Sequence, residues 1–179
     1  MKTKVNGNAI KAKSNIALIG FMSTGKTSVG RLLSERLSKE FVETDSMVIR
    51  MAGKSIGRIF DEDGELRFRE LEMLAVEKAS RMKDVVISCG GGAVLNKLNI
   101  DRLRDSSRVV LLTASKAVIL ERAKKEKVAR PVLNKARKAS NIDELIAFRK
   151  PLYEAYADFA VDTTTISIDE AVRQVLKRL

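Results

Sequence analysis

The chain has 179 residues, of which 45% are hydrophobic and 32% charged, with 34 Lys and Arg against 23 Asp and Glu. This size and apolar content are enough for one globular domain and exclude a large multidomain machine. No apolar run approaches the roughly 20 residues that cross a bilayer, and the N-terminus has no apolar signal segment. The single cysteine, Cys89, suits a reducing compartment. We therefore expect a cytoplasmic protein without a membrane partner.

The net charge of +11 is concentrated in two segments. Residues 1–14 hold four lysines and no acid, and we predict that they form a basic, poorly ordered arm before a single domain over 15–179. Residues 121–138 hold eight basic residues against two glutamates, and we interpret about 122–138 as a basic lid over phosphates. A solvated helix face and a nucleic-acid patch are the alternatives, although aromatic side chains that stack on bases are scarce.

The first predicted elements are a strand at 16–19 and a helix at 26–39, and residues 20–27 join them. This junction reads Gly-Phe-Met-Ser-Thr-Gly-Lys-Thr, the G-x-x-x-x-G-K-[ST] pattern of a phosphate-binding loop, or P-loop. Its backbone N–H groups and the start of the helix favour phosphate oxygens. Lys26 can reach the outer phosphates and Thr27 can offer its hydroxyl to magnesium. A chance match is the alternative, which the flanking strand and helix disfavour, so we predict binding of a nucleoside triphosphate.

Strands and helices alternate along the rest of the chain. We predict further strands at 41–43, 85–88, 108–112 and 159–161, further helices at 64–82, 115–125, 141–156 and 168–179, and one or two short helices within 45–63. This alternation indicates a parallel sheet with helices on both faces. Ligands bind at the carboxyl ends of the strands in such sheets, so the residues that follow each strand are the candidates for chemistry.

The second strand ends at Glu43-Thr44-Asp45, and the chain contains no histidine. A general base is therefore expected to be a carboxylate. Glu43 and Asp45 are two residues apart, so they would face the same way on an extended strand. One could help to position magnesium while the other meets a substrate hydroxyl. Asp45 could instead only cap the helix that follows.

Two further patterns suggest an anionic ligand. Three glycines, Gly90, Gly91 and Gly92, follow the third strand and could bring backbone donors close to a ligand, with a flexible turn as the alternative. Arg69 and Glu72 share a helix face, where Glu72 could hold Arg69 rigid for a carboxylate; a simple surface ion pair is the alternative. Arg130 and Arg149, the first just before Pro131 and the second two residues before Pro151, are additional candidate anion contacts.

Taken together, these motifs resemble the shikimate kinase family from about Asn15 to the C-terminus. The quoted elements are the P-loop, Thr44-Asp45, Phe60-x-x-x-Gly64-Glu65-x-x-Phe68-Arg69-x-x-Glu72, Gly90-Gly91-Gly92-Ala93-Val94, Arg130-Pro131, Arg149-x-Pro151-Leu152-Tyr153 and Val161-Asp162-Thr163. The P-loop alone fits many families, whereas the Phe-Arg-x-x-Glu, triple-glycine and Arg-x-Pro-Leu-Tyr set is far more specific. The resemblance implies a three-layer α/β/α P-loop fold with a lid and a five-stranded parallel sheet of order 2-3-1-4-5.

The resemblance also implies an activity and its residues. The expected reaction is transfer of the ATP γ-phosphoryl group to the 3-hydroxyl of shikimate, with Mg²⁺, in aromatic amino-acid biosynthesis. The implied catalytic residues are Lys26, Asp45 and Arg130. The implied shikimate contacts are Asp45, Arg69, Gly90, Gly91, Gly92 and Arg149. The implied ATP contacts are Ser23, Thr24, Gly25, Lys26, Thr27, Ser28, Arg122 and Arg130, with Thr27 and Glu43 on the magnesium side, Glu43 through water.

Two positions depart from the family pattern. Glu43 stands where the family usually has Asp, and we expect a weaker or shifted magnesium dependence rather than loss of activity. Ser23 stands where the family loop often has Gly, with little effect expected. We expect a monomer that binds small molecules and no nucleic acid. The competing hypotheses are another small P-loop kinase such as a gluconate kinase, a non-catalytic shikimate-kinase-like protein, and a P-loop protein that binds nucleic acid.

Overall fold

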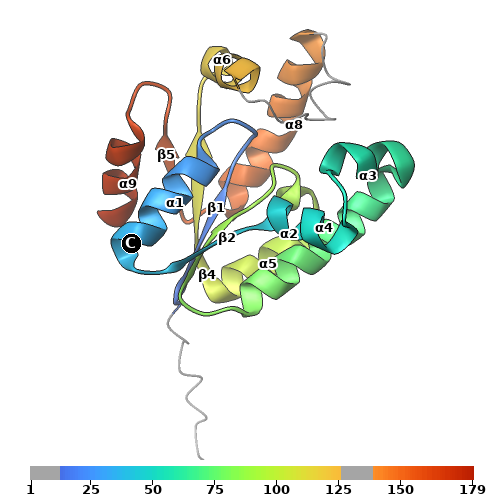
Figure 1. Ribbon diagram of the computed structural model, residues 1–179. Coiled ribbons are helices and arrows are strands. Elements are labelled where there is room, and N and C mark those ends of the chain that lie inside the picture. Colours follow the sequence, from blue (N-terminus) through green and yellow to red (C-terminus); the bar gives the residue numbers. More distant parts are fainter. Residues whose placement is uncertain (1–12, 126–138) are drawn as a thin grey trace, which may run out of the picture.

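The computed structural model describes residues 13–125 and 139–179, and it contains an all-parallel five-stranded sheet (Figure 1). The strands are β1 (Asn15–Ile19), β2 (Glu40–Glu43), β3 (Val85–Ser88), β4 (Ser107–Thr113) and β5 (Phe159–Asp162). Their order is β2-β3-β1-β4-β5, with Ile16 of β1 opposite Val86 on one side and Arg108 on the other. The predicted fold class and strand order are confirmed.

The helices form a layer on each face of the sheet. Their bounds are α1 (Lys26–Leu37), α2 (Thr44–Ala52), α3 (Ile56–Glu62), α4 (Gly64–Arg81), α5 (Lys97–Ser106), α6 (Lys116–Lys125), α8 (Ala139–Tyr156) and α9 (Ile168–Leu176), with a 3₁₀ turn η1 (Ala93–Leu95). Because side chains alternate along a strand, Leu18 of β1 packs with α1 and α9, whereas Ala17 and Ile19 pack with α4, α5 and α8. These two cores give the three-layer architecture.

The position of β1 in the sheet explains its composition. All five of its residues are buried, as expected for a central parallel strand covered on both faces. The edge strands are less buried, and β5 exposes Ala160 and Asp162. The central placement of β1 puts the P-loop that follows it in the middle of the carboxyl edge of the sheet.

A third, smaller core lies beside the sheet and joins α2, α3 and α4. Val48, Ile59, Phe68, Leu71 and Ala75 form its buried centre. This core places the first half of α4, which carries Arg69 and Glu72, next to the carboxyl ends of β2 and β3. In Figure 1 this unit stands on the opposite side of the sheet edge from α6 and α9.

One helix was missing from the predicted elements. Helix α5 occupies Lys97–Ser106, between the triple glycine and β4. Among its apolar residues only Ile100 and Leu103 are fully buried, so its apolar pattern is short. The sequence feature that could have predicted this helix is Asn96, a residue type that favours helix N-caps. Its side chain accepts a hydrogen bond from the Leu98 N–H at 2.9 Å and caps the helix.

The predicted arm and lid fall largely outside the described residues. Residues 1–12 of the arm and 126–138 of the lid, with Arg130 and Pro131, are not described, so these two assignments stay predictions. Within 13–125 and 139–179, no helix has both the length and the apolar character needed to cross a membrane.

Candidate functional site

The P-loop connects β1 to α1 and folds back over the end of β4. Gly20 has a φ of 143°, and a Cβ on it would lie 2.2 Å from the Leu112 carbonyl oxygen, so only glycine fits this position. Ser23 and Gly25 also have positive φ values, of 58° and 92°. The left-handed conformation at Ser23 is a physical reason to expect glycine at this position of the loop, as the family resemblance implies. Lys26 Nζ donates to the carbonyl oxygens of Gly20 and Phe21 at 2.9 and 2.7 Å.

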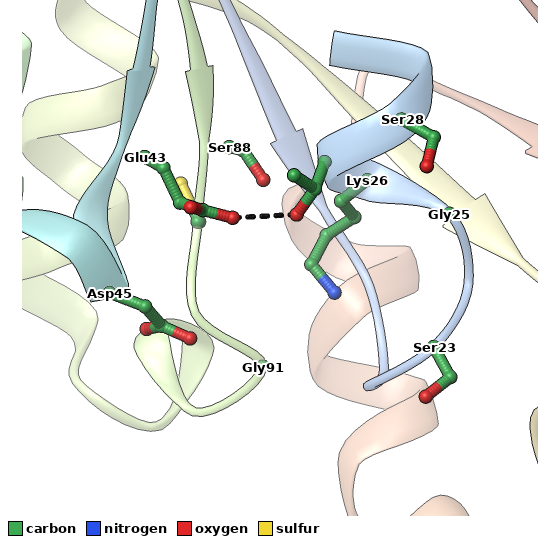
Figure 2. A pocket seen from close by; sticks show the side chains of 10 residues that line it. Ser23, Gly25, Lys26, Ser28, Glu43, Asp45, Ser88 and Gly91 are labelled. Atoms are coloured by element: carbon green, nitrogen blue, oxygen red, sulfur yellow. Dashed lines mark hydrogen bonds between the residues drawn. The ribbon is translucent and has the colours of Figure 1, made fainter. Parts of the chain in front are cut away.

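A polar pocket lies between the P-loop and the ends of β2 and β3 (Figure 2). Its lining residues are Ser23, Gly25, Lys26, Thr27, Ser28, Glu43, Asp45, Ser88, Cys89 and Gly91. The structure therefore brings together five predicted phosphate-side residues and the two acids that follow the second strand. Thr24 does not line this pocket, because its buried hydroxyl donates to the Phe21 carbonyl oxygen at 2.8 Å. All of them come from the carboxyl edge of the parallel sheet, where ligands are expected to bind.

Glu43 faces the P-loop across this pocket. The Thr27 hydroxyl donates to Glu43 Oε1 at 2.6 Å, the bond dashed in Figure 2, and the Ser46 hydroxyl donates to Oε2 at 2.7 Å. Magnesium in phosphate-transfer sites takes hard oxygen donors, usually one or two carboxylates with water and substrate phosphates. A hydroxyl and a carboxylate in contact fit that requirement. Among the residues that the structure describes, no group of three or more acidic or cysteine side chains forms a dedicated metal cage.

Asp45 reaches the pocket from a helix rather than from a strand. Strand β2 ends at Glu43 and α2 starts at Thr44, so Asp45 lies in the first helical turn and the expected extended-strand alternation was wrong. Glu43 occupies the N-cap position and no side chain makes the capping bond, so the alternative role of Asp45 as the cap was wrong too. The helix start nevertheless points Asp45 into the same pocket as Glu43.

The triple glycine allows side chains to approach the backbone closely. A Cβ on Gly90 would lie 2.4 Å from Asp45 Oδ1 and 3.1 Å from Glu72 Oε1. A Cβ on Gly92 would lie 2.1 Å from Arg69 Nη1. Any other residue would therefore displace these side chains, which explains two of the glycines by close packing rather than by flexibility. The buried Thr44 hydroxyl accepts from the Gly90 N–H at 2.9 Å and fixes the start of this turn.

Arg69 is held by two acids on its own helix. Its guanidinium lies 2.8 Å from Glu72 Oε2 and 3.0 Å from Glu65 Oε1, and the Glu72 side chain is only 1% exposed. The pair is therefore not a simple surface ion pair. Burial raises the pKa of the Glu72 carboxyl even though Arg69 opposes the shift. Glu72 Oε1 has no hydrogen-bond partner and faces the Gly90 turn.

Arg149 approaches the same turn from α8. The residue is 5% exposed, its guanidinium lies 5.8 Å from the Phe21 ring centroid, and Nη1 donates weakly to the Gly91 carbonyl oxygen at 3.4 Å. Its Nε has no partner. A buried cation with unused donors is costly unless an anion meets it. Arg69 thus approaches the triple glycine at Gly92 and Arg149 approaches it at Gly91, so both guanidinium groups could meet an anion there.

A second pocket lies on the outer side of the P-loop. Its volume is about 530 Å³, and it is lined by Ser23, Gly25, Ser28, Val29, Arg122, Lys125, Thr163, Ile166, Ser167, Ile168 and Ala171. Apolar side chains and one arginine suit a flat heteroaromatic ring. Arg122, predicted as an ATP contact, lies in this pocket, while Arg130 lies outside the described residues.

Cys89 directly precedes the triple glycine at the base of the polar pocket and is only 2% exposed. Burial raises the pKa of its thiol to about 12, since the lowering effect of Lys26 is smaller. We therefore expect a thiol reagent such as 5,5′-dithiobis(2-nitrobenzoate) to react with Cys89 at pH 8 only after the protein is unfolded in denaturant. Rapid labelling of the folded protein would contradict this expectation.

Three side chains at the site had no predicted role. Tyr153 donates its hydroxyl to the Gly91 carbonyl oxygen at 2.5 Å, Ser46 bonds Glu43, and Thr163 contacts the P-loop. Tyr153 and Thr163 belong to the Arg-x-Pro-Leu-Tyr and Val-Asp-Thr motifs of the sequence. These motifs marked both residues as part of the family pattern but indicated no function for either side chain. Ser46 carried no signal, because a serine in a first helical turn is ordinary.

Comparisons with known proteins identify the family to which the chain belongs. The family model described as shikimate kinase matches residues 22–179. The shikimate kinase of Caldanaerobacter subterraneus subsp. tengcongensis is 44% identical over 91% of this chain and 94% of its own length, and that of Pelotomaculum thermopropionicum is 43% identical over 90% and 93%.

Solved structures give the same result. The shikimate kinase from Acinetobacter baumannii in complex with shikimate has a TM-score of 0.88 at 31% identity, covering 95% of this chain and 94% of that chain. A gluconokinase from Sinorhizobium meliloti has a TM-score of 0.62 at 20% identity, covering 92% of this chain and 90% of that chain, which is a likeness of fold. This chain belongs to the shikimate kinase family.

Proposed function

We propose that this chain, an ATP-dependent kinase by its family, transfers the ATP γ-phosphoryl group to the 3-hydroxyl of shikimate through the residues described above. The observation that carries the proposal is the pair of arginines around the triple glycine. Arg69 is fixed by Glu72, and Arg149 is buried with an unpaired Nε. Two rigid guanidinium groups at one turn support recognition of a small carboxylate, since arginine forks match carboxylate oxygens.

Asp45 is assigned the role of orienting the attacking hydroxyl and accepting its proton. It lies across the pocket from the P-loop, against the turn that the arginines flank. A carboxylate there can meet a ring hydroxyl while the shikimate carboxylate is held by Arg69 and Arg149. Phosphoryl transfer depends mainly on such alignment and on charge stabilisation, so this arrangement supports the reaction.

The phosphate side is assigned to the P-loop residues. Lys26 would leave the carbonyl oxygens that it now contacts and bind the transferred phosphoryl oxygens. Thr27 and Glu43 would hold Mg²⁺, with Glu43 acting through water. When bound, the ion neutralises charge on the β- and γ-phosphates. Backbone N–H groups of residues 23–28 and the Ser28 hydroxyl supply donors, whereas the Thr24 hydroxyl is engaged by the Phe21 carbonyl. Arg122 contacts the nucleotide from the outer pocket, and Arg130 is assigned to lid closure from the family resemblance alone.

We propose a cytoplasmic monomer that acts on ATP and shikimate and has no nucleic-acid or membrane partner. Of the competing hypotheses, a gluconate kinase would also bind a carboxylate, so the comparison of shikimate with gluconate as acceptors distinguishes the two. A P-loop protein that uses its +11 charge on nucleic acid would bind it without ATP and lose that binding steeply with salt.

The test is a coupled ADP-release assay with ATP and Mg²⁺ that compares shikimate, gluconate, a nucleoside monophosphate and no acceptor. We expect a large rate with shikimate only. ATP binding without shikimate-dependent ADP release would reject the catalytic proposal and favour a non-catalytic relative. A gluconate-dependent rate would reject the substrate.

The unusual Glu43 gives a separate prediction. Shortening the side chain by one methylene in Glu43→Asp withdraws its carboxylate by about 1.5 Å from the Thr27 hydroxyl that it now contacts. We expect turnover to stay within about tenfold, ~1.4 kcal/mol, while the magnesium concentration for half-maximal rate shifts. A magnesium titration of kcat measures both. A much larger loss of kcat at saturating magnesium would show that Glu and Asp are not interchangeable here.

A further inference from the structure

Thr163 lies behind the P-loop at the junction of three elements. It follows β5 directly and is 4% exposed. Its hydroxyl lies 3.0 Å from the carbonyl oxygen of Thr24 in the P-loop and 3.0 Å from that of Thr113 at the end of β4. The hydroxyl has one proton, so it donates to one of these carbonyls at a time, and its lone pairs accept from Arg122 Nη1 at 3.0 Å.

Arg122 completes this set of contacts. Its Nη2 donates to the Thr163 carbonyl oxygen at 2.7 Å, and its Nη1 also lies 3.4 Å from the Ser23 carbonyl oxygen. Two successive carbonyl groups of the loop, those of Ser23 and Thr24, are therefore engaged from the outer side by Arg122 and Thr163. The contact of Arg122 with the Ser23 carbonyl is long, at 3.4 Å, whereas the hydrogen bond from Thr163 to the Thr24 carbonyl is 3.0 Å. Thr163 therefore makes the stronger of the two contacts.

The geometry of the peptide bond connects these contacts to phosphate binding. In a trans peptide unit the C=O and the following N–H point in opposite directions. Holding the Thr24 carbonyl outward thus turns the Gly25 N–H toward the inner side of the loop, where the phosphate pocket lies. The backbone on both sides of Thr24 is in an uncommon conformation, because Ser23, a non-glycine residue, has a φ of 58° and Gly25 has a φ of 92°. Such a backbone persists only where surrounding contacts hold it, as the contact of Thr163 with Thr24 does.

We infer that Thr163 is a positioning residue that holds the P-loop peptide between Thr24 and Gly25 in its phosphate-binding orientation. This inference rests on the proposed function, since it concerns the grip on the ATP phosphates. It assigns Thr163 no contact with substrate. The hydroxyl acts through the Thr24 carbonyl, so its loss affects the triphosphate and not the shikimate half of the site.

The experiment compares Thr163→Val, Thr163→Ser and the exposed matched control Thr165→Val. Isothermal titration calorimetry with Mg²⁺ measures binding of a non-hydrolysable ATP analogue and of inorganic tripolyphosphate, and a separate titration without nucleotide measures binding of shikimate. We expect Thr163→Val to weaken the analogue and tripolyphosphate by about tenfold or more, ~1.4 kcal/mol, with shikimate affinity unchanged. Thr163→Ser, which keeps the hydroxyl, and Thr165→Val should bind as the unmodified protein does.

Several results would overturn the inference. Unchanged tripolyphosphate binding in Thr163→Val would do so, as would a loss in Thr163→Ser as large as in Thr163→Val. A parallel loss of nucleotide and shikimate affinity with a lower Tm would indicate a purely structural role. Failure of the unmodified protein to bind the ATP analogue would overturn both this inference and the proposed function. The shikimate-dependent rate of the unmodified protein tests the proposed function separately.

Discussion

Replacing Asp45 by asparagine is expected to lower kcat for shikimate phosphorylation by about 10² to 10⁴-fold, the range found for loss of a general base. Asparagine keeps the size of the side chain and its ability to hydrogen-bond a ring hydroxyl. It cannot accept the proton as a carboxylate does. Asp45 faces the P-loop across the pocket and packs against Gly90. Because asparagine at this position keeps the hydrogen bond to the substrate, the substitution should slow the transfer step rather than weaken shikimate binding.

Steady-state kinetics with both substrates varied would measure this effect. The KM for shikimate should change by less than about tenfold, ~1.4 kcal/mol. Asp61→Asn is the matched control, because Asp61 is an exposed residue of α3 outside the pocket. If Asp45→Asn retained kcat within a few fold, the hydroxyl would be deprotonated without this carboxylate, and Asp45 would only orient the substrate.

Replacing Arg149 by methionine should have the second large effect, and it should appear in the KM for shikimate. The guanidinium is buried, with an unpaired Nε and only a weak bond to the Gly91 carbonyl. A carboxylate bound there would be a desolvated ion pair, and truncating one partner of such a pair costs about 2–5 kcal/mol. That corresponds to a rise of about 30-fold to several thousand-fold in KM.

Two comparisons make the Arg149 result specific. Lys150→Met removes a charge from the adjacent, 65% exposed side chain and should leave kinetics unchanged. Shikimate methyl ester lacks the carboxylate, so the unmodified protein should discriminate strongly against it and Arg149→Met only weakly. Equal losses for the acid and the ester would place the carboxylate elsewhere, and a rise in the KM for ATP alone would place Arg149 on the nucleotide side.

The two halves of the site connect through the glycine turn. Gly91 lies close to the P-loop, since a Cβ on it would be 3.5 Å from the Met22 nitrogen, and its carbonyl accepts from Tyr153 and Arg149 of α8. The buried Tyr153 hydroxyl has its pKa raised to about 12 by desolvation, so it stays protonated and can donate this bond at neutral pH. Helix α8 thus fixes the turn between the P-loop and the region proposed to bind the carboxylate.

The sequence by itself determined the fold class, and it predicted the residues on the phosphate side of the site. Its local patterns were strong there: an apolar strand, a glycine-rich loop with Lys26 and Thr27, and alternating strands and helices. Such signals depend on residues close together in the chain, so they can be read directly. The triple glycine and the Arg69–Glu72 spacing were also visible, although each had an ordinary alternative.

Only the tertiary structure decided how distant residues meet. It showed that Asp45 lies on a helix and not on the strand, that Glu72 is buried, and that Arg149 comes from α8 to the same turn as Arg69. It also revealed Thr163 against a P-loop carbonyl that is 139 positions earlier in the chain. These contacts arise because a parallel sheet gathers the ends of strands that are far apart in sequence, and no local pattern encodes which side chains meet there.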